Sequence, residues 1–207
     1  MRIHSGSVLA AFALAASLGS ASSTIAGGPL SHIDPGVQAP DFTAPGADGR
    51  VHRLSDYAGR IVVLEWTNPV CPYTGMKYQD GALQALQKTA SAQGVTWIAI
   101  DTAAPDRPGY LTPTGMRERI ARTGMHVTAF LSDPDGRIGR EYGAKTTPEI
   151  YVIGRDGKLA YEGAVDDNPA AELPGGASYV GAAIADLRAG KPVGTPQTMP
   201  YGCAVEY

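Results

Sequence analysis

Cys71 is the residue of this chain whose type and position best fit covalent chemistry. It stands between an apolar run, residues 61–66, and a segment expected to be helical from Met76 to about Ser91. The first turn of a helix offers unpaired N–H groups and the positive end of the macrodipole, and both favour a thiolate over a thiol. Pro72 suits the first helical position, which makes Cys71 the predicted N-cap. The sequence therefore predicts a nucleophilic thiolate, and the alternative is a small residue that fills a gap in the core.

Alternating strand and helix patterns surround this cysteine. Continuous apolar runs predict buried strands, and apolar residues at helical spacing predict the helices between them. The expected strands are 39–45, 51–54, 61–66, 95–101, 128–131, 149–153 and 159–162, and the expected helices are 76–91, 114–122, 137–142 and 179–189. This order predicts an α/β fold with a central mixed β-sheet, helices on both faces and an N-terminal β-hairpin extension. Residues 36–190 form one domain in this interpretation, and residues 191–207 form a C-terminal tail.

The start of the chain has the layout of an export signal. Arg2 precedes an apolar block, residues 8–18, which is followed by small and polar residues. The block is too short to anchor the protein permanently in a bilayer, and cleavage fits after either Ala21 or Ala26. We therefore expect a signal peptide over residues 1–26, no membrane anchor, and a periplasmic or secreted protein in a compartment where disulfides persist.

Several other functions find no support in the sequence. The formal net charge of -3 provides no basic footprint for nucleic acid. His32, His52 and His126 are scattered without metal-ligand spacing, so no metal site is expected. No glycine-rich phosphate loop and no serine nucleophile elbow occurs, and we expect no cofactor. Asp166 and Asp167 could line a site, and an acidic turn before Pro169 is the default interpretation.

Four short motifs give the chain a family resemblance. They are Ala39-Pro40-Asp41-Phe42, Val70-Cys71-Pro72, Asp133-Pro134-Asp135-Gly136, and Thr146-Thr147-Pro148 directly before an apolar strand. With the order of strands and helices, they make the chain resemble the thioredoxin superfamily, and within it the peroxiredoxin-like group related to alkyl hydroperoxide reductase and thiol-specific antioxidant proteins. Asn68-Pro69-Val70-Cys71-Pro72 and Tyr201-Gly202-Cys203 are similar to motifs of exported redoxin-domain proteins. The resemblance implies a thioredoxin-like fold over nearly the whole mature chain.

The resemblance also implies roles for residues around Cys71. Cys71 would be the attacking thiolate, with Thr147 and Pro148 forming a cis-proline corner beside it. Glu65 stands where thioredoxins carry a buried acid, and a buried carboxyl with a raised pKa can act as a base; the alternative is a salt-bridged or solvated glutamate. Thr74 can offer its hydroxyl to Cys71 one helical turn away, or be a polar residue at a helix start. Thr74 also replaces the second cysteine of a Cys-x-x-Cys motif, so exchange within that turn is excluded.

Cys203, near the end of the tail, is the second candidate for redox chemistry. Oxidation of a lone cysteine gives a sulfenic acid, which needs another thiol to restore it. Cys203 is the only other cysteine in the chain, and its tail is long enough to return to Cys71. Three states stay open: a working pair, within one chain or between subunits; a permanent structural disulfide; and two unpaired thiols.

Together these observations predict an exported thiol oxidoreductase with antioxidant, peroxiredoxin-like activity that reacts through Cys71. The expected substrate is a peroxide or a protein disulfide, and the expected reductant is an external thiol. Two alternatives remain. One is a thiol-disulfide reductase of periplasmic proteins, and the other is a non-catalytic binding module that keeps the fold.

Overall fold

The chain has 207 residues, of which the computed structural model describes residues 1–2, 30–169 and 176–207. From residue 3 onward, the predicted signal peptide lies outside the described residues. In the described part, none of the helices combines the length and the apolar character needed to span a membrane.

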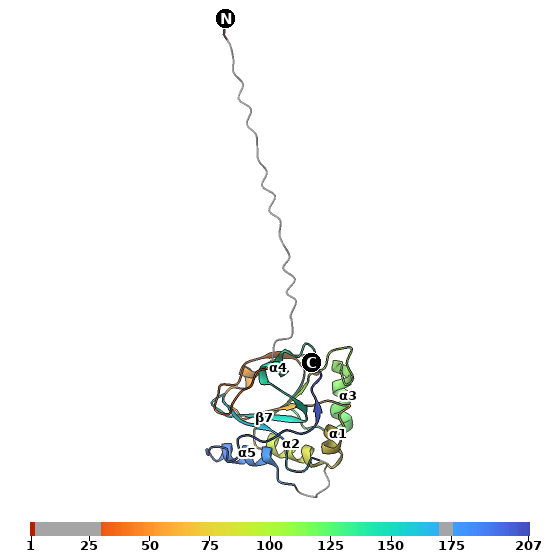
Figure 1. Cartoon of the computed structure of the whole chain (residues 1–207), viewed down its shortest axis with the longest axis vertical. Helices are drawn as coiled ribbons and strands as arrows, with labels where there is room; N and C mark the ends of the chain where they lie inside the picture. Colours follow the sequence, from red (N-terminus) through yellow and green to blue (C-terminus); the bar gives the residue numbers. More distant parts are fainter. Residues whose placement is uncertain (3–29, 170–175) are drawn as a thin grey trace.

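A mixed five-stranded sheet forms the centre of the fold, in the order β5-β4-β3-β7-β8 (Figure 1). Strands β3, β4 and β5 are parallel, whereas β7 runs antiparallel to both β3 and β8. Every residue of β3, β4 and β7 is buried, as the continuous apolar runs predict. The strand bounds are Val62–Trp66 (β3), Thr96–Asp101 (β4), Ala129–Ser132 (β5), Glu149–Ile153 (β7) and Leu159–Gly163 (β8).

Helices cover both faces of this sheet, which confirms the predicted layers. Figure 1 shows α2 and α5 on one side of β7 and α4 on the other. Side chains of α1, α2, α3 and α5 share one apolar core, and α4 shares the second with the N-terminal hairpin β1–β2. The helix bounds are Pro72–Gln79 (α1), Ala82–Ala92 (α2), Pro113–Thr123 (α3), Arg137–Tyr142 (α4) and Tyr179–Arg188 (α5), and those of the hairpin region are Thr43–Pro45 (β1), Val51–Arg53 (β2) and the 3-10 helix Leu54–Tyr57.

The single helix expected from Met76 to about Ser91 is wrong in its continuity. The chain forms two helices, α1 and α2, because Gly81 adopts a left-handed φ of 77° between them. The Asp80 carboxylate accepts the Ala82 N–H at 2.9 Å and so starts the second helix. Helix α1 also begins earlier than the apolar spacing indicated, directly after Cys71.

Two short strands escape sequence analysis altogether. Strand β6, Thr146–Thr147, pairs antiparallel with β9, Cys203–Ala204, and Thr147 lies opposite Cys203. Two residues are too few to show strand periodicity, so no pattern in the sequence indicates this pairing. The segment predicted to be a free tail is therefore attached to the sheet domain at the corner before β7.

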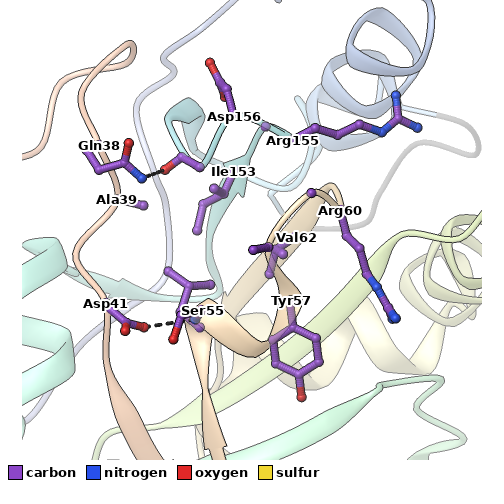
Figure 2. Close-up of a pocket in the computed structure, with 15 residues that line it drawn as sticks. Gln38, Ala39, Asp41, Ser55, Tyr57, Arg60, Val62, Ile153, Arg155 and Asp156 are labelled. Atoms are coloured by element: carbon purple, nitrogen blue, oxygen red, sulfur yellow. Dashed lines mark hydrogen bonds between the residues drawn. The ribbon is translucent and has the colours of Figure 1, made fainter.

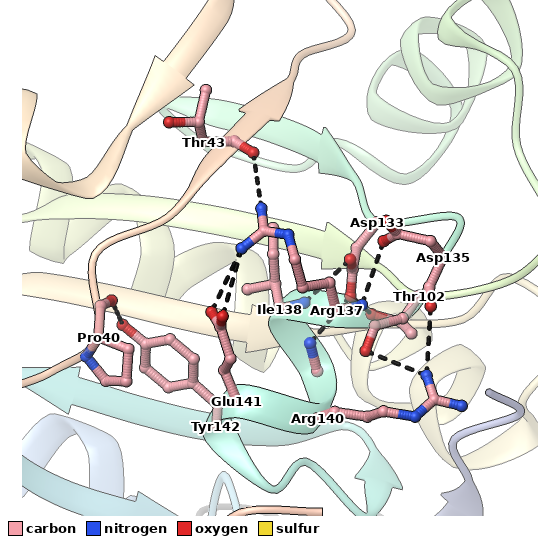
Figure 3. A network of polar contacts seen from close by, with 12 residues as sticks. Pro40, Thr43, Thr102, Asp133, Asp135, Arg137, Ile138, Arg140, Glu141 and Tyr142 are labelled. Atoms are coloured by element: carbon pink, nitrogen blue, oxygen red, sulfur yellow. Dashed lines mark hydrogen bonds and ion pairs between the residues drawn. The ribbon is translucent and has the colours of Figure 1, made fainter. Parts of the chain in front are cut away.

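A buried carboxylate, Asp133, organises the face that carries α4 (Figure 3). It is 2% exposed and accepts the N–H groups of Ile138 and Gly139 at 3.1 and 2.9 Å. It also accepts the hydroxyl of Thr102, at the end of β4, at 2.8 Å. The Asp-Pro-Asp-Gly motif thus starts α4 and joins it to the ends of two central strands.

Helix α4 in turn holds the N-terminal segment, as Figure 3 shows. The guanidinium of Arg137 donates to the carbonyl of Thr43 in β1 at 3.2 Å. The hydroxyl of Tyr142 donates to the carbonyl of Pro40 at 2.7 Å. Two of the motifs that carry the family resemblance, Ala39-Pro40-Asp41-Phe42 and the Asp133 turn, are therefore parts of one packing unit.

Replacing Asp133 by alanine should lower the free energy of unfolding by about 3 kcal/mol, because buried donors lose their acceptor. Urea unfolding of the oxidised protein measures this value. Asp135→Ala is the matched control: its carboxylate is exposed and accepts one bond, from the Arg137 N–H at 3.1 Å. The control should cost about 1 kcal/mol or less. Equal losses in the two variants would contradict this account of the turn.

Candidate redox site

Cys71 lies where β3 ends and α1 begins, as the sequence predicts. It is the N-cap residue of α1, and Pro72 occupies the first helical position. The turn that delivers it is fixed by Asn68, whose side-chain oxygen accepts the Val70 N–H at 2.9 Å and whose carbonyl accepts the Cys71 N–H at 3.3 Å. The sulfur therefore sits at the positive end of a helix whose first N–H groups have no intrahelical acceptor.

The corner at Thr147 and Pro148 meets this cysteine. The peptide bond between the two residues is cis, and the Thr147 carbonyl oxygen lies 2.9 Å from Sγ of Cys71. The sheet brings them together because β3 and β7 are neighbours, with Trp66 opposite Glu149. The end of β3 and the entry to β7 consequently share one edge of the sheet.

Cys203 completes the site through a disulfide to Cys71. The two Cα atoms are 5.9 Å apart, a usual separation for a disulfide, although the residues are 132 apart in sequence. Pairing of Cys203 with Thr147 across β9 and β6 positions the second sulfur. Both cysteines of the chain are in this bond, so the alternative of two unpaired thiols is wrong.

The two halves of the disulfide differ in exposure. Cys71 is only 3% exposed, whereas Cys203 is partly exposed. The Cys71 sulfur is bonded to Cys203 and faces the Thr147 carbonyl. Cys71 is thus covered in the oxidised state and can meet a substrate only after the bond opens.

Glu65 lies in the core of the same strand, β3, and is fully buried. Its carboxyl accepts the Tyr78 hydroxyl at 2.7 Å, the Gln87 amide at 2.9 Å and the Trp97 indole N–H at 2.7 Å. Burial raises the pKa of Glu65, as expected, and these hydrogen bonds partly oppose the rise. The alternative of a salt-bridged or solvated glutamate is wrong.

The sequence leaves open whether Glu65 points into the core or toward the sulfur, and its partners place it in the core. Among the described residues, the partners of its carboxyl lie in α1, α2 and β4, and Cys71 is not one of them. Tyr78 connects Glu65 to Cys71 indirectly, because Tyr78 bonds to Glu65 and belongs to the helix that begins at Cys71. Burial and the neighbouring carboxyl raise the pKa of Tyr78, so its hydroxyl stays a proton donor to Glu65.

Thr74 does not make the predicted hydrogen bond to Cys71. Its side chain is fully buried, and its hydroxyl has no hydrogen-bond partner among the described residues. The Cys71 sulfur is instead bonded to Cys203 and faces the Thr147 carbonyl. The hydroxyl of Thr147 is also buried without a partner in the described structure.

Sequence analysis found neither Lys77 nor Tyr201 as a site residue, and it named Asp166 only as one that could line a site. Lys77 is 1% exposed and pairs with both carboxylate oxygens of Asp166 at 2.9 Å, and Asp166 accepts the Tyr201 hydroxyl at 2.6 Å. The interpretation of Asp166 as a plain acidic turn is therefore incomplete. Tyr201 belongs to the Tyr201-Gly202-Cys203 motif, which is the signal in the sequence that could have singled it out.

A cavity of about 260 Å³ lies at the opposite end of β3 from the disulfide. It is lined by the first residue of β3, Val62, by Ile153 at the end of β7, and by the turn after it (Figure 2). Figure 2 shows the side chains of Arg155 and Asp156 extending outward from its rim. This cavity is separate from the redox site and contributes no residue to it.

Glu65→Gln should make the protein less sensitive to pH. The folded-state pKa of Glu65 is raised above 4.5, so its contribution to stability is full at low pH and is lost as pH rises from 4.5 through the folded-state pKa. The free energy of unfolding of the wild type should fall relative to the variant by up to about 1.4 kcal/mol per pH unit in that window.

Urea unfolding of both oxidised proteins over a pH series measures this difference. Glu141→Gln, which changes a glutamate that is 40% exposed, is the control and should show a constant difference from the wild type. A pH-independent difference for Glu65→Gln as well would contradict the raised pKa.

Comparison with known proteins assigns this site to a family. The AhpC/TSA family profile matches residues 35–162. The chain is 29% identical over 126 residues to the thiol-disulfide oxidoreductase ResA of Geobacillus thermodenitrificans, which covers 60% of this chain and 66% of that protein. It is 27% identical over 146 residues to a candidate peroxiredoxin of Mycobacterium tuberculosis, which covers 61% of this chain and 82% of that protein.

Solved structures agree with the family profile. The crystal structure of an uncharacterized conserved protein from Geobacillus kaustophilus matches with a TM-score of 0.77 and 27% identity, over 84% of this chain and 93% of that one. A candidate thiol:disulfide interchange protein, DsbE of Chlorobium tepidum, matches with a TM-score of 0.51 and 28% identity, over 63% of this chain and 84% of that one. The fold is thioredoxin-like, as predicted. By its matched profile over more than half of its length, the chain belongs to the AhpC/TSA family.

Proposed function

We propose that this protein is an exported thiol oxidoreductase in which Cys71 attacks the substrate and Cys203 resolves the product. The observation that carries the proposal is the position of the Cys71–Cys203 bond, at the N-terminus of α1 and against the Thr147 carbonyl. A purely structural bridge could lie anywhere on the surface, whereas this one occupies the reactive corner of the fold. We favour the working pair over the permanent bridge for that reason.

The chain is a thiol oxidoreductase by family and by the redox pair that it contains. Its relatives leave two substrate classes open, since one is named as a thiol-disulfide oxidoreductase and another as a candidate peroxiredoxin. We favour a peroxide, in line with the AhpC/TSA profile, and keep a protein disulfide as the second candidate.

With a peroxide, the Cys71 thiolate attacks the terminal oxygen and breaks the O–O bond. The products are a sulfenic acid on Cys71 and an alkoxide or hydroxide, which takes up a proton. The Cys203 thiol then attacks the sulfenic sulfur, forms the observed disulfide and releases water. One peroxide has gained two electrons and the two thiols have lost them.

With a protein disulfide, the same two residues act in the same order. The Cys71 thiolate displaces one substrate sulfur and forms a mixed disulfide. The Cys203 thiolate attacks Cys71 in that intermediate, and the second substrate sulfur leaves as a thiolate. Both routes end in the bond that the structure contains, so the substrate decides only the first step.

An external dithiol must restore the enzyme in either case. We infer that it attacks the sulfur of Cys203, because Cys203 is partly exposed and Cys71 is only 3% exposed. Cys71 then leaves as a thiolate that faces the first turn of α1, where the helix N-terminus stabilises negative charge. The second thiol of the reductant then attacks the reductant sulfur in the mixed disulfide, and Cys203 leaves as a thiolate.

The other residues of the site are assigned supporting roles in this proposal. The Thr147 carbonyl and the cis Pro148 bound the space in which substrate meets Cys71. The hydroxyl of Thr74, which has no partner in the described oxidised structure, can bond to the Cys71 sulfur once the disulfide opens. Glu65 acts at a distance, as a positioning residue that holds Tyr78 and so α1.

Replacing either cysteine by serine separates these roles. Cys71→Ser should abolish both peroxide consumption and reduction of a model protein disulfide. Cys203→Ser should allow one turnover and then stop, with a sulfenic acid or mixed disulfide trapped on Cys71 and detected by mass spectrometry. Full activity of Cys71→Ser would refute the proposal, and inactivity of the wild type toward both substrates would favour the non-catalytic binding module.

Export is proposed from the N-terminal sequence pattern. A protein expressed with its complete N-terminus should be recovered from the periplasm or medium without its first residues. N-terminal sequencing should then start at Ser22 or Gly27, after the two cleavage positions that the pattern allows. Recovery of intact chain in the cytoplasm alone would contradict export.

A further inference from the structure

The tail that carries Cys203 pairs with the domain over short stretches of backbone. Glu162 bonds to the Pro196 carbonyl and the Thr198 N–H, each at 3.1 Å, and the Val205 N–H donates to the Lys145 carbonyl at 3.0 Å. Strands β6 and β9 pair over two residues each, with Thr146 opposite Ala204 and Thr147 opposite Cys203. A two-stranded ribbon of this length is not stable by itself in water. Just before it, Met199 is 87% exposed and lies with Pro200 over a hollow of about 350 Å³. Side-chain contacts next to Cys203 therefore add to a backbone pairing that is short.

On the N-terminal side of Cys203, Tyr201 makes the nearest side-chain contacts in sequence. Its hydroxyl donates to Asp166 at 2.6 Å, and its ring centroid lies 5.6 Å from Nζ of Lys77 and 6.3 Å from the ring of Tyr73. Burial and the bond to Asp166 raise the pKa of Tyr201, which keeps the hydroxyl a donor. One aromatic side chain thus meets a carboxylate, an ammonium and a second ring.

The residue between Tyr201 and Cys203 is a glycine for a reason that the structure shows. Gly202 has a φ of 141°, and a side chain there would collide with the backbone carbonyl of Thr147. The tail can therefore approach the cis-proline corner closely enough for pairing. The three residues act together. Tyr201 anchors the tail, Gly202 lets it approach the corner closely, and Cys203 supplies the sulfur.

The base of the anchor is a buried ion pair. Lys77 is 1% exposed, and its ammonium bonds to both oxygens of Asp166 and to the carbonyl of Asn168. An ammonium buried this deeply must be paired, so Asp166 is held firmly in one position. Lys77 also belongs to α1, the helix that begins at Cys71. The same rigid element therefore carries Cys71 and the foundation on which the Cys203 tail is anchored.

We propose that Lys77, Asp166 and Tyr201 are positioning residues that keep the Cys203 thiol docked beside Cys71 when the disulfide is open. This inference rests on the proposed function, in which the pair is reduced and reformed in each cycle. A docked thiol has a high effective concentration at Cys71, which accelerates disulfide formation and makes the disulfide harder to reduce. A tail held by its other contacts alone would have this advantage to a smaller degree.

The direct test is the redox equilibrium of the pair in the full chain, measured in dithiothreitol buffers by mass spectrometry after alkylation. Tyr201→Phe removes only the hydroxyl that bonds to Asp166. We expect a disulfide that is about tenfold easier to reduce, which corresponds to a potential about 30 mV less negative for this two-electron couple. A merely structural role for Tyr201 would leave this potential unchanged.

Tyr179→Phe is the matched control. It makes the same chemical change in α5, at a tyrosine whose hydroxyl has no hydrogen bond to a described residue, and should keep the wild-type potential. Asp166→Asn tests the ion pair, with circular dichroism to show that the variant is folded. The double variant combines Asp166→Asn with Tyr201→Phe. If the three residues act as one unit, it should shift the potential by less than the sum of the two single shifts.

The outcomes separate this inference from the function on which it rests. A wild-type disulfide that does not equilibrate with dithiothreitol would overturn both. A wild-type pair that titrates reversibly, with Tyr201→Phe at the same potential, would overturn the anchor and leave the redox function standing. A shift in Tyr201→Phe and none in Tyr179→Phe would support the anchor.

Discussion

The return of the C-terminal tail to the cis-proline corner is the contact on which the rest of the site depends. Pairing of Cys203 with Thr147 brings together two sulfurs that are 132 residues apart in sequence. Helix α1 then supplies N–H groups on one side of Cys71, and the Thr147 carbonyl bounds the other. Without the tail, the same fold would hold a single thiol, and its oxidised form would have no partner within the chain.

Buried polar groups hold the elements around this contact. Glu65 and Asp133 both lie inside the domain, and each is bonded by donors from neighbouring elements. Burying a carboxyl without such donors is costly, so each network fixes the elements that meet there. Helix α1 is held at three points. It begins at Cys71, its Tyr78 bonds to Glu65, and its Lys77 pairs with Asp166. The position of Cys71 follows from these three attachments of one helix.

Local sequence signals predicted the fold and the first cysteine well, because the signals and their causes lie within a few residues of each other. The apolar run before Cys71 and the proline after it identify a strand end and an N-cap, and the structure has both. The hydrogen bond that Thr74 could offer to Cys71 is absent from the described structure, in which the sulfur is bonded to a distant residue, Cys203. Tyr201 was missed as a site residue, since its partner Asp166 lies 35 residues away. Contacts between distant segments leave no periodicity in the sequence, and the site is built largely from them.

The account assigns the tail a working role in each catalytic cycle, so the most direct measurement is kinetic. Reduced protein would be mixed with one equivalent of peroxide or protein disulfide, quenched at intervals with acid, and analysed by mass for the Cys71–Cys203 bond. The account predicts that this bond forms at least as fast as steady-state turnover with the better substrate. Formation of the bond more slowly than turnover would contradict it, because the disulfide would then lie outside the catalytic path.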